Sequence, residues 1–330
     1  MTKENIHIDI RAFESMQEVG GLKKFKENNP VNIENYKGII GDYNFRDEVK
    51  CCREKSNGNL CAHEHKYGFV VRLKDNSVSI IGNVCAKKHF DASTKFRKDI
   101  KKYENEKRRL SKLERLKELL AKKKENIALI DSLRDKIKIL RERNTIFLNS
   151  LGIRTAKKLQ DNAQSKKTSV EVDVVKYKAY EDEYGEEYRD KQVTPARIGV
   201  LKGLSVFTEY VFRAIYHDMN EIIASYDEAD NVSHDMKLSK LEKLTSAIAK
   251  IDKVKIDVLK IEQEASAFFD NDLTLLCYLT DDKSDRFKTA RAVLELNGEK
   301  VGKEKAKSWL VGIDSKMKEA LKADKIEIQY

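Results

Sequence analysis

Apolar positions recur at helical spacing over two long stretches of the chain. Between residues 110 and 151 they follow one another at steps of three and four residues, and the same pattern returns between 234 and 269. This spacing places apolar side chains on one face of a helix. The sequence therefore predicts a long helix over 91–151 and another over about 234–269. We expect their apolar stripes to pack together as an antiparallel pair.

Two other parts of the chain have the composition of β-strands. Residues 67–73 and 77–82 are rich in β-branched and aromatic residues and flank a turn, which is typical of a hairpin. Residues 152–194 alternate partly and contain an acidic turn, so they predict a β-hairpin insert. Thr194 and Pro195 then have the residue types of an N-cap and a first helical position.

Together these elements predict an α+β protein that is mostly helical. The 330 residues contain only two prolines, which favours long helices. We expect shorter helices near 284–296 and 302–322 and a strand at the end of the chain. The predicted segments are an N-terminal region at 1–90 with a small module at 51–90, a basic coiled-coil helix at 91–151, a hairpin insert at 152–194, and a helical domain at 195–330 packing on the coiled coil.

Residues that bind metals are concentrated in the small module. Four of the five cysteines and three of the six histidines lie between positions 51 and 89. In a reducing compartment such clusters bind metal more often than they form disulfides, and zinc prefers four thiolate or imidazole ligands. Cys85 and His89 are spaced to share one face of a helix. We predict one structural Zn²⁺ held by Cys52, Cys61, Cys85 and His89, with Cys51 as the alternative to Cys52 and His63 as the alternative to Cys61.

The order of these features resembles the treble-clef class of zinc fingers: a ligand-bearing loop, a β-hairpin, then two ligands at a helix start. The resemblance covers residues 51–90 only, and it implies a small fold organised by a structural zinc ion. The chain departs from the class in its first ligand pair, which is normally closely spaced in a tight knuckle. Here eight residues separate Cys52 from Cys61, whereas Cys61 and His63 have one residue between them.

The same module also admits a catalytic interpretation. A ββα-metal (HNH-like) nuclease carries a histidine on a hairpin and an asparagine and a histidine further along, and His65, Asn83 and His89 follow that order. The gap from Asn83 to His89 is short for this class, and His89 suits zinc better. The chain lacks a Walker-type motif, GxGxxG, GxSxG and HExxH. The sequence therefore favours a non-enzymatic protein and indicates no small-molecule substrate.

The net charge of +10 is concentrated just after the module. Residues 95–124 contain 14 lysines and arginines against five acidic residues. A localised basic surface binds polyanions and releases their counterions. The predicted nucleic-acid contacts are Lys87, Lys88, Lys95, Arg97, Lys98, Lys101, Lys102, Lys107, Arg108, Arg109 and Lys112.

The leading hypothesis is a zinc-binding coiled-coil protein that binds DNA or RNA without catalysis. In this hypothesis the helical C-terminal half would dimerise or hold a protein partner. The alternative is a structural adaptor whose zinc module and coiled coil bind only proteins. No stretch approaches the roughly 18 apolar residues of a membrane span, and the N-terminus does not have the pattern of a signal peptide. We therefore expect a cytoplasmic protein without membrane partners.

Overall fold

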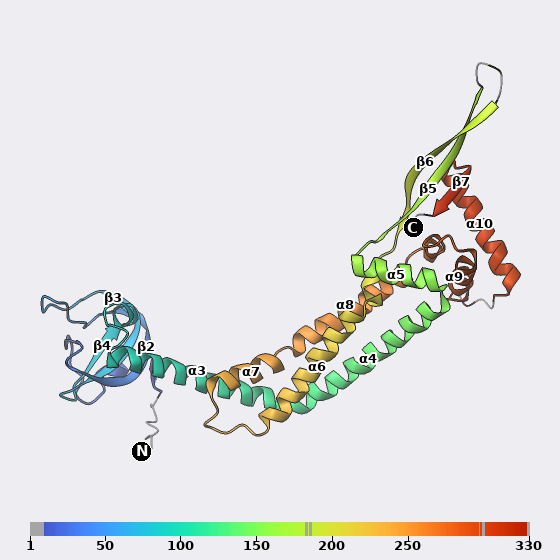
Figure 1. The fold of residues 1–330 in the computed structure, drawn as a ribbon. Helices are drawn as coiled ribbons and strands as arrows, with labels where there is room; N and C mark the ends of the chain where they lie inside the picture. The colour runs from blue at the N-terminus through green and yellow to red at the C-terminus, as the bar shows by residue number, and fades with distance from the viewer. Residues whose placement is uncertain (1–9, 182–183, 185–186, 297, 299–300, 329–330) are drawn as a thin grey trace. The chain divides into compact units, whose positions relative to one another are not determined.

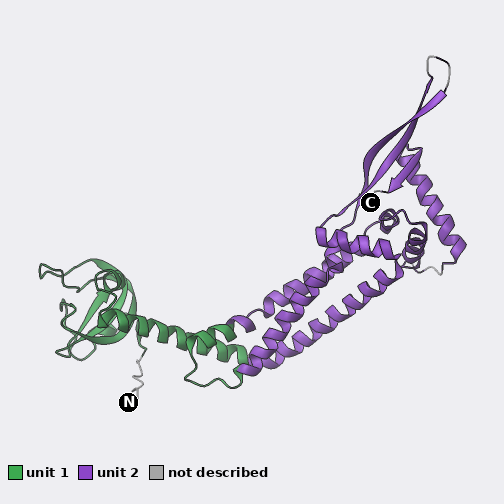
Figure 2. Cartoon of the chain, viewed as in Figure 1, with its two compact units in different colours: residues 1–120, 229–245 green, residues 121–228, 246–330 purple. Residues whose placement is uncertain are grey.

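The computed structural model describes residues 10–181, 184, 187–296, 298 and 301–328. These residues form ten α-helices, two short 3₁₀ helices and seven strands in two small sheets (Figure 1), which confirms the predicted mostly helical α+β class. The chain divides into two compact units (Figure 2). Unit 1 comprises residues 1–120 and 229–245, and unit 2 comprises residues 121–228 and 246–330.

A four-stranded sheet organises unit 1, with the order β1-β2-β3-β4. Strand β1 (Ala12–Phe13) pairs in parallel with β2 (Tyr36–Lys50), and helix α1 (Met16–Gly20) follows β1. Strands β3 (Glu64–Leu73) and β4 (Val78–Gly82) form an antiparallel hairpin. The hairpin predicted between residues 67 and 82 is therefore present. It leads directly into helix α2 (Asn83–Lys88).

The start of helix α3 (Lys95–Ala121) packs on this sheet through one face. Phe96, Ile100 and Tyr103 are buried and spaced by three or four residues. The Phe96 ring lies 4.4 Å from the ring of Tyr36, and Tyr103 meets Phe69 edge-on at 6.3 Å. Because this face is buried, the basic side chains on the opposite side of α3 are turned to solvent.

The stretch 91–151, predicted as a single helix, begins later and contains two helices. Helices α3 and α4 (Lys123–Ser150) meet at Lys122. Before α3, the Asp91 side chain accepts hydrogen bonds from Ser93, and Thr94 Oγ1 accepts one from the Arg97 N–H at 3.3 Å. These local bonds compete with helix formation and separate α2 from α3.

Helix α4 runs antiparallel to α6 (Glu209–Ala229) in unit 2. Asn126 Nδ2, near the start of α4, donates to the Tyr226 hydroxyl at 2.6 Å, near the end of α6. Arg141, further along α4, pairs at 2.6 Å with Glu209 at the start of α6. The second contact lies later in α4 and earlier in α6, so the two helices point in opposite directions.

The predicted antiparallel pairing with the later stripe is wrong, because α8 (Ile251–Phe269) runs parallel to α4. Lys136 pairs with Glu262 at 3.4 Å, and the Arg143 guanidinium lies over the Phe269 ring at 4.0 Å. Both contacts advance together along the two helices. Helix α6 is the antiparallel element, and the chain reverses again before α7 (Leu238–Ile248) and α8. The predicted helix over 234–269 is thus two helices.

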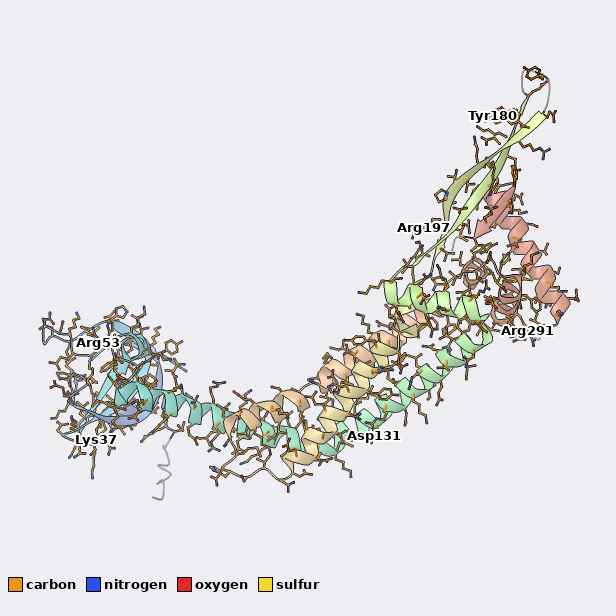
Figure 3. The ribbon with its side chains drawn as sticks, in the orientation of Figure 1. Lys37, Arg53, Asp131, Tyr180, Arg197 and Arg291 are labelled. Carbon is orange, nitrogen blue, oxygen red and sulfur yellow. The ribbon has the colours of Figure 1, made fainter. Side chains whose placement is uncertain are left out.

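A second sheet in unit 2 has the order β6-β5-β7. Strands β5 (Ser169–Glu181) and β6 (Glu187–Val200) form the predicted hairpin, and Tyr180 lies near its tip (Figure 3). The rings of Tyr180 and Tyr188 stack across the hairpin with their centroids 5.6 Å apart. The helix start predicted at Thr194 and Pro195 is wrong, because both residues lie within β6. A proline is tolerated there because β6 is an edge strand, where its missing N–H costs no ladder bond.

The remaining elements of unit 2 pack around this sheet and the helices. Residues at the start of the predicted hairpin insert instead form α5 (Ile153–Ser165). The expected shorter helices are α9 (Lys283–Leu296) and α10 (Lys303–Leu321), and the expected terminal strand is β7 (Lys325–Ile328). The two 3₁₀ helices are η1 (Leu204–Phe207) and η2 (Leu273–Tyr278). Among the described helices, none combines the length and apolarity that crossing a bilayer requires.

Candidate metal centre

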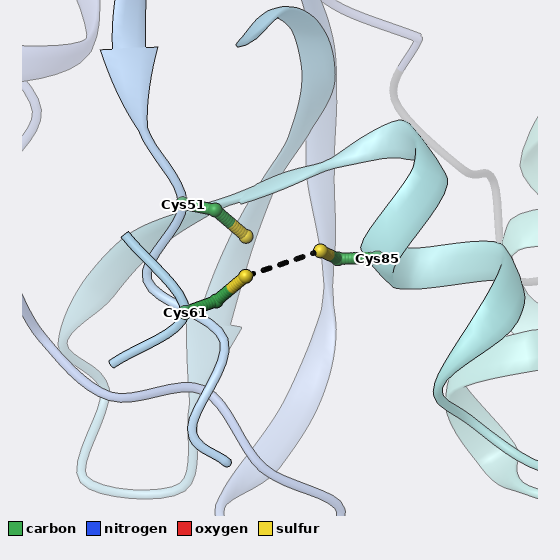
Figure 4. Close-up of side chains that lie close together, drawn as sticks. All are labelled: Cys51, Cys61 and Cys85. Carbon is green, nitrogen blue, oxygen red and sulfur yellow. Dashed lines mark hydrogen bonds between the residues drawn. The ribbon is translucent and has the colours of Figure 1, made fainter. Parts of the chain in front are cut away.

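Three cysteines from separate parts of unit 1 converge on one point (Figure 4). Cys51 directly follows β2, Cys61 lies in the loop before β3, and Cys85 lies in α2. Their Sγ atoms are all within 4.8 Å of one another, and those of Cys61 and Cys85 are 3.6 Å apart. Three sulfur atoms at this separation could hold a single metal ion.

Backbone hydrogen bonds explain why Cys51 and Cys61 lie side by side. The Cys51 N–H donates to the His63 carbonyl at 3.0 Å, and the Ala62 N–H donates back to the Cys51 carbonyl at 3.0 Å. The Cys61 N–H also donates to the Arg53 carbonyl at 2.7 Å. The loop therefore folds back on itself and brings Cys51 and Cys61 together, although nine residues lie between them, a wider gap than a zinc knuckle normally has.

The structure places Cys51, rather than the preferred Cys52, beside Cys61 and Cys85. Cys52 is also buried, but its thiol lies 3.8 Å from the Lys50 carbonyl oxygen and outside the group. Neighbouring side chains on extended backbone point to opposite sides, so only one of the two cysteines can face Cys85. The alternation of side chains along a strand could in principle have distinguished Cys51 from Cys52. Applying it requires the residue at which β2 ends, and the sequence alone does not define that residue.

The two candidate histidine ligands lie outside the group of three cysteines. His63 is exposed, and its carbonyl takes part in the loop described above. His89 is exposed at the end of α2, where its N–H donates to the Cys85 carbonyl at 3.1 Å. His89 is thus one helical turn from Cys85, as its spacing predicted, although its ring does not join the three sulfur atoms.

His65 has a packed environment of its own. Its Nε2 lies 2.5 Å from the Tyr43 hydroxyl, and its Nδ1 lies 3.1 Å from the His63 carbonyl oxygen. The ring rests against Gly82, where a Cβ would approach it to 2.9 Å. Burial lowers the pKa of His65, which favours the neutral imidazole. Both ring nitrogens are therefore committed to contacts within the fold, which argues against its use as a nuclease base.

The electrostatic surroundings differ among the three thiols. Burial raises the pKa of Cys85 to about 12, with Cys51 and Cys61 contributing. Burial also acts to raise the pKa of Cys61. This effect is outweighed by hydrogen bonds from the His63 backbone and from Cys85 and by the nearby Arg53 guanidinium, so the pKa of Cys61 is lowered overall. Arg53 lies in the sheet region of unit 1 (Figure 3). Its Nε is buried and has no hydrogen-bond partner among the described residues.

This donor set fits a soft or borderline metal ion. Thiolate ligands select ions such as Zn²⁺, and a bound cation supplies the positive charge that deprotonates buried thiols such as Cys85. The guanidinium of Arg53, a partly buried residue, offsets part of the negative charge that several thiolates would leave at the site. The three cysteines could therefore hold a metal ion, and the fourth ligand has to come from elsewhere.

The predicted nucleic-acid contacts fall into two groups. Five of the eleven already have partners within unit 1: Lys87 with Glu104, Lys95 with the Lys37 carbonyl, Lys107 with Asp42, Arg108 with Glu242, and Arg109 with Glu106. The basic side chains at 107–109 thus form ion pairs within the folded protein. The other six have no ion pair within the described part of the chain: Lys88, Arg97, Lys98, Lys101, Lys102 and Lys112.

No protein-family model, no curated protein and no solved structure matches this chain.

Proposed function

We propose that the protein binds nucleic acid, DNA or RNA, through α3, without catalysing a reaction. The observation that carries this proposal is the group Lys98, Lys101 and Lys102. These side chains are exposed on the face of α3 opposite Phe96, Ile100 and Tyr103, and they form no ion pair within the described residues. Unpaired, solvated cations in a row can neutralise phosphates without first breaking a bond inside the protein.

The proposal includes a structural zinc ion held by Cys51, Cys61, Cys85 and His89. The exposed imidazole of His89 is one turn of α2 away from Cys85, so a rotation of its side chain would bring it toward the sulfur atoms. Zinc would cross-link the loop after β2 to α2 and thereby stabilise the surface on which α3 packs. A site with four protein ligands is closed, which suits a structural role.

The alternative is an adaptor that binds only proteins through the same module and helices. No feature of the described residues favours it over nucleic-acid binding, so it serves as the competing outcome of the experiment. A cytoplasmic location remains a prediction from the sequence, compatible with reduced cysteines that bind metal.

The experiment compares three proteins in fluorescence anisotropy with labelled duplex DNA, single-stranded DNA and RNA. The first is the wild type, and the second carries Lys98→Glu, Lys101→Glu and Lys102→Glu. The control carries the same charge change on exposed lysines of unit 2: Lys260→Glu, Lys303→Glu and Lys316→Glu. We expect the α3 variant to lose binding and the control to retain it. No binding by the wild type, or an equal loss in the control, would reject the proposal.

A further inference from the structure

Cys61 is the one cysteine of the chain that is not buried. The other four have almost no exposed surface, whereas Cys61 is half-buried in the loop before β3. The guanidinium of Arg53 lies near its sulfur. Reactive cysteines are typically partly exposed and close to a positive charge. An oxidant in solution therefore reaches the sulfur of Cys61 before that of any other cysteine.

Cys85 is placed to form a disulfide with an oxidised Cys61. The two Sγ atoms are 3.6 Å apart and a disulfide requires about 2.05 Å, so they have to approach each other by about 1.5 Å. A change of side-chain rotamer moves a cysteine sulfur farther than this. The gap between the two sulfur atoms is therefore within reach of side-chain movement.

Cys51, the third thiol of the group, is less accessible. Its side chain is only 1% exposed, and its Sγ accepts a hydrogen bond from the Gly82 N–H at 3.4 Å. Cys52 is buried as well and lies outside the group. Of the pairings that the four cysteines of unit 1 could form, Cys61 with Cys85 combines access for an oxidant with a nearby second thiol.

We propose that Cys61 and Cys85 form a redox site that hydrogen peroxide oxidises to a disulfide. The Cys61 thiolate attacks one peroxide oxygen, the O–O bond breaks, and a sulfenic acid forms with release of hydroxide. The Cys85 sulfur then attacks the Cys61 sulfur, and the sulfenic hydroxyl leaves with the Cys85 proton as water. The two thiols together lose two electrons, and the peroxide is reduced to water. A dithiol reductant reverses the change by disulfide exchange.

Oxidation of this pair and metal binding should exclude each other, a consequence that rests on the zinc ion of the proposed function. The disulfide consumes two of the three thiols of the group. Of the four proposed ligands, Cys51 and His89 then remain, whereas a structural zinc site needs four. Peroxide should therefore release the zinc ion as the disulfide forms.

The experiment treats the reduced full chain with hydrogen peroxide, alkylates the remaining thiols and digests the protein with trypsin without reduction. Cleavage after lysine and arginine places Cys51 and Cys52 on peptide 51–53, Cys61 on 56–66 and Cys85 on 75–87. Mass spectrometry therefore identifies the pairing directly. We expect peptides 56–66 and 75–87 to be cross-linked, with the link lost on reduction and with zinc released in proportion to it.

Two variants and a denatured sample complete the design. Cys85→Ser should abolish the cross-link, whereas Cys52→Ser, which removes a buried thiol outside the group, should keep both the cross-link and its zinc release. Oxidation of the chain in denaturant gives the mixture of pairings that arises without the fold.

Three results would overturn the inference: no cross-link in the native protein, a main product that joins peptide 51–53 to another peptide, or the same mixture as in denaturant. Zinc analysis before oxidation separates this inference from the zinc proposal. Zinc in the untreated protein without the cross-link after peroxide rejects the inference alone. The cross-link in a protein that never held zinc rejects the zinc ion and supports the redox pair.

Discussion

The Sγ atoms of Cys61 and Cys85 lie 3.6 Å apart, although 24 positions separate the two residues along the chain. A disulfide requires about 2.05 Å between its sulfur atoms, so the two thiols are close without being bonded. Cys51 lies within 4.8 Å of both. Three thiols at this separation around one point are better suited to a shared metal ion than to any one disulfide.

Removing the metal should unfold unit 1 and leave unit 2 intact. Metal-binding free energy in small modules is also folding free energy, and the core of unit 1 adjoins Cys51 and Cys85. The only tryptophan, Trp309, lies in α10 of unit 2. A strong chelator should therefore change the far-ultraviolet circular dichroism and leave Trp309 fluorescence unchanged. If neither signal changes when the metal is stripped, the site does not stabilise the fold.

The salt dependence of nucleic-acid binding should report on the lysines of α3. Each phosphate contact adds about 0.9 to the slope of log K against log salt for duplex DNA. Replacing Lys101 alone with glutamine should lower that slope by about one contact. The same change at Lys107, which already pairs with Asp42, should alter the slope less. A larger effect at Lys107 than at Lys101 would contradict the assignment of the free cations.

A carboxylate in unit 2 should make stability depend on pH. Asp218 is buried, which opposes its ionisation, but Lys253 at 2.5 Å and Lys250 at 3.3 Å lower its pKa below the ordinary value of 3.8. Its contribution is therefore complete above pH 3.8 and is lost as pH falls through the lowered pKa. Asp218→Asn should cost about 1 kcal/mol at neutral pH, since both lysines are solvated, and progressively less as the pH falls through the lowered pKa. A pH-independent cost would contradict the ion-pair explanation.

Two glycines of unit 2 should respond in opposite ways to alanine. Gly203 has a φ of +71°, and a Cβ there would lie 2.0 Å from the Glu264 carbonyl oxygen. Gly312 lies inside α10 with nothing within 4 Å of a Cβ. Gly203→Ala should destabilise the protein by at least about 3 kcal/mol, whereas Gly312→Ala should stabilise it by about 0.5–1 kcal/mol. Chemical denaturation measures both, and similar effects at the two positions would contradict the packing described for Gly203.

The sequence predicted local elements better than their pairing. Hydrophobic periodicity identified the stretches that form α4 and α8, because that signal lies within each segment. It did not reveal that the two helices run parallel, since direction depends on α6 and on the reversals before and after it. Thr194 and Pro195 have the residue types of a helix start, yet hydrogen bonding to β5 places them in an edge strand.

For the candidate metal centre, too, the sequence identified the region but not the exact arrangement of its residues. Clustering of cysteines and histidines identified the region, and two of the four preferred ligands, Cys61 and Cys85, lie in the group of three. The choice between Cys51 and Cys52 depended on where β2 ends, which composition does not define to a single residue. The pairing of the basic run at 107–109 with acids distant in the chain, such as Asp42 and Glu242, also required the tertiary structure.

The most direct test of the metal centre is the zinc content of freshly purified protein in two neighbouring variants. Cys51→Ser removes a thiol of the group, whereas Cys52→Ser removes an equally buried thiol outside it. Metal analysis should find about one zinc per chain in the wild type and in Cys52→Ser, and little or none in Cys51→Ser. Loss of zinc in Cys52→Ser with retention in Cys51→Ser, or a wild type that contains no zinc, would contradict the zinc site proposed here.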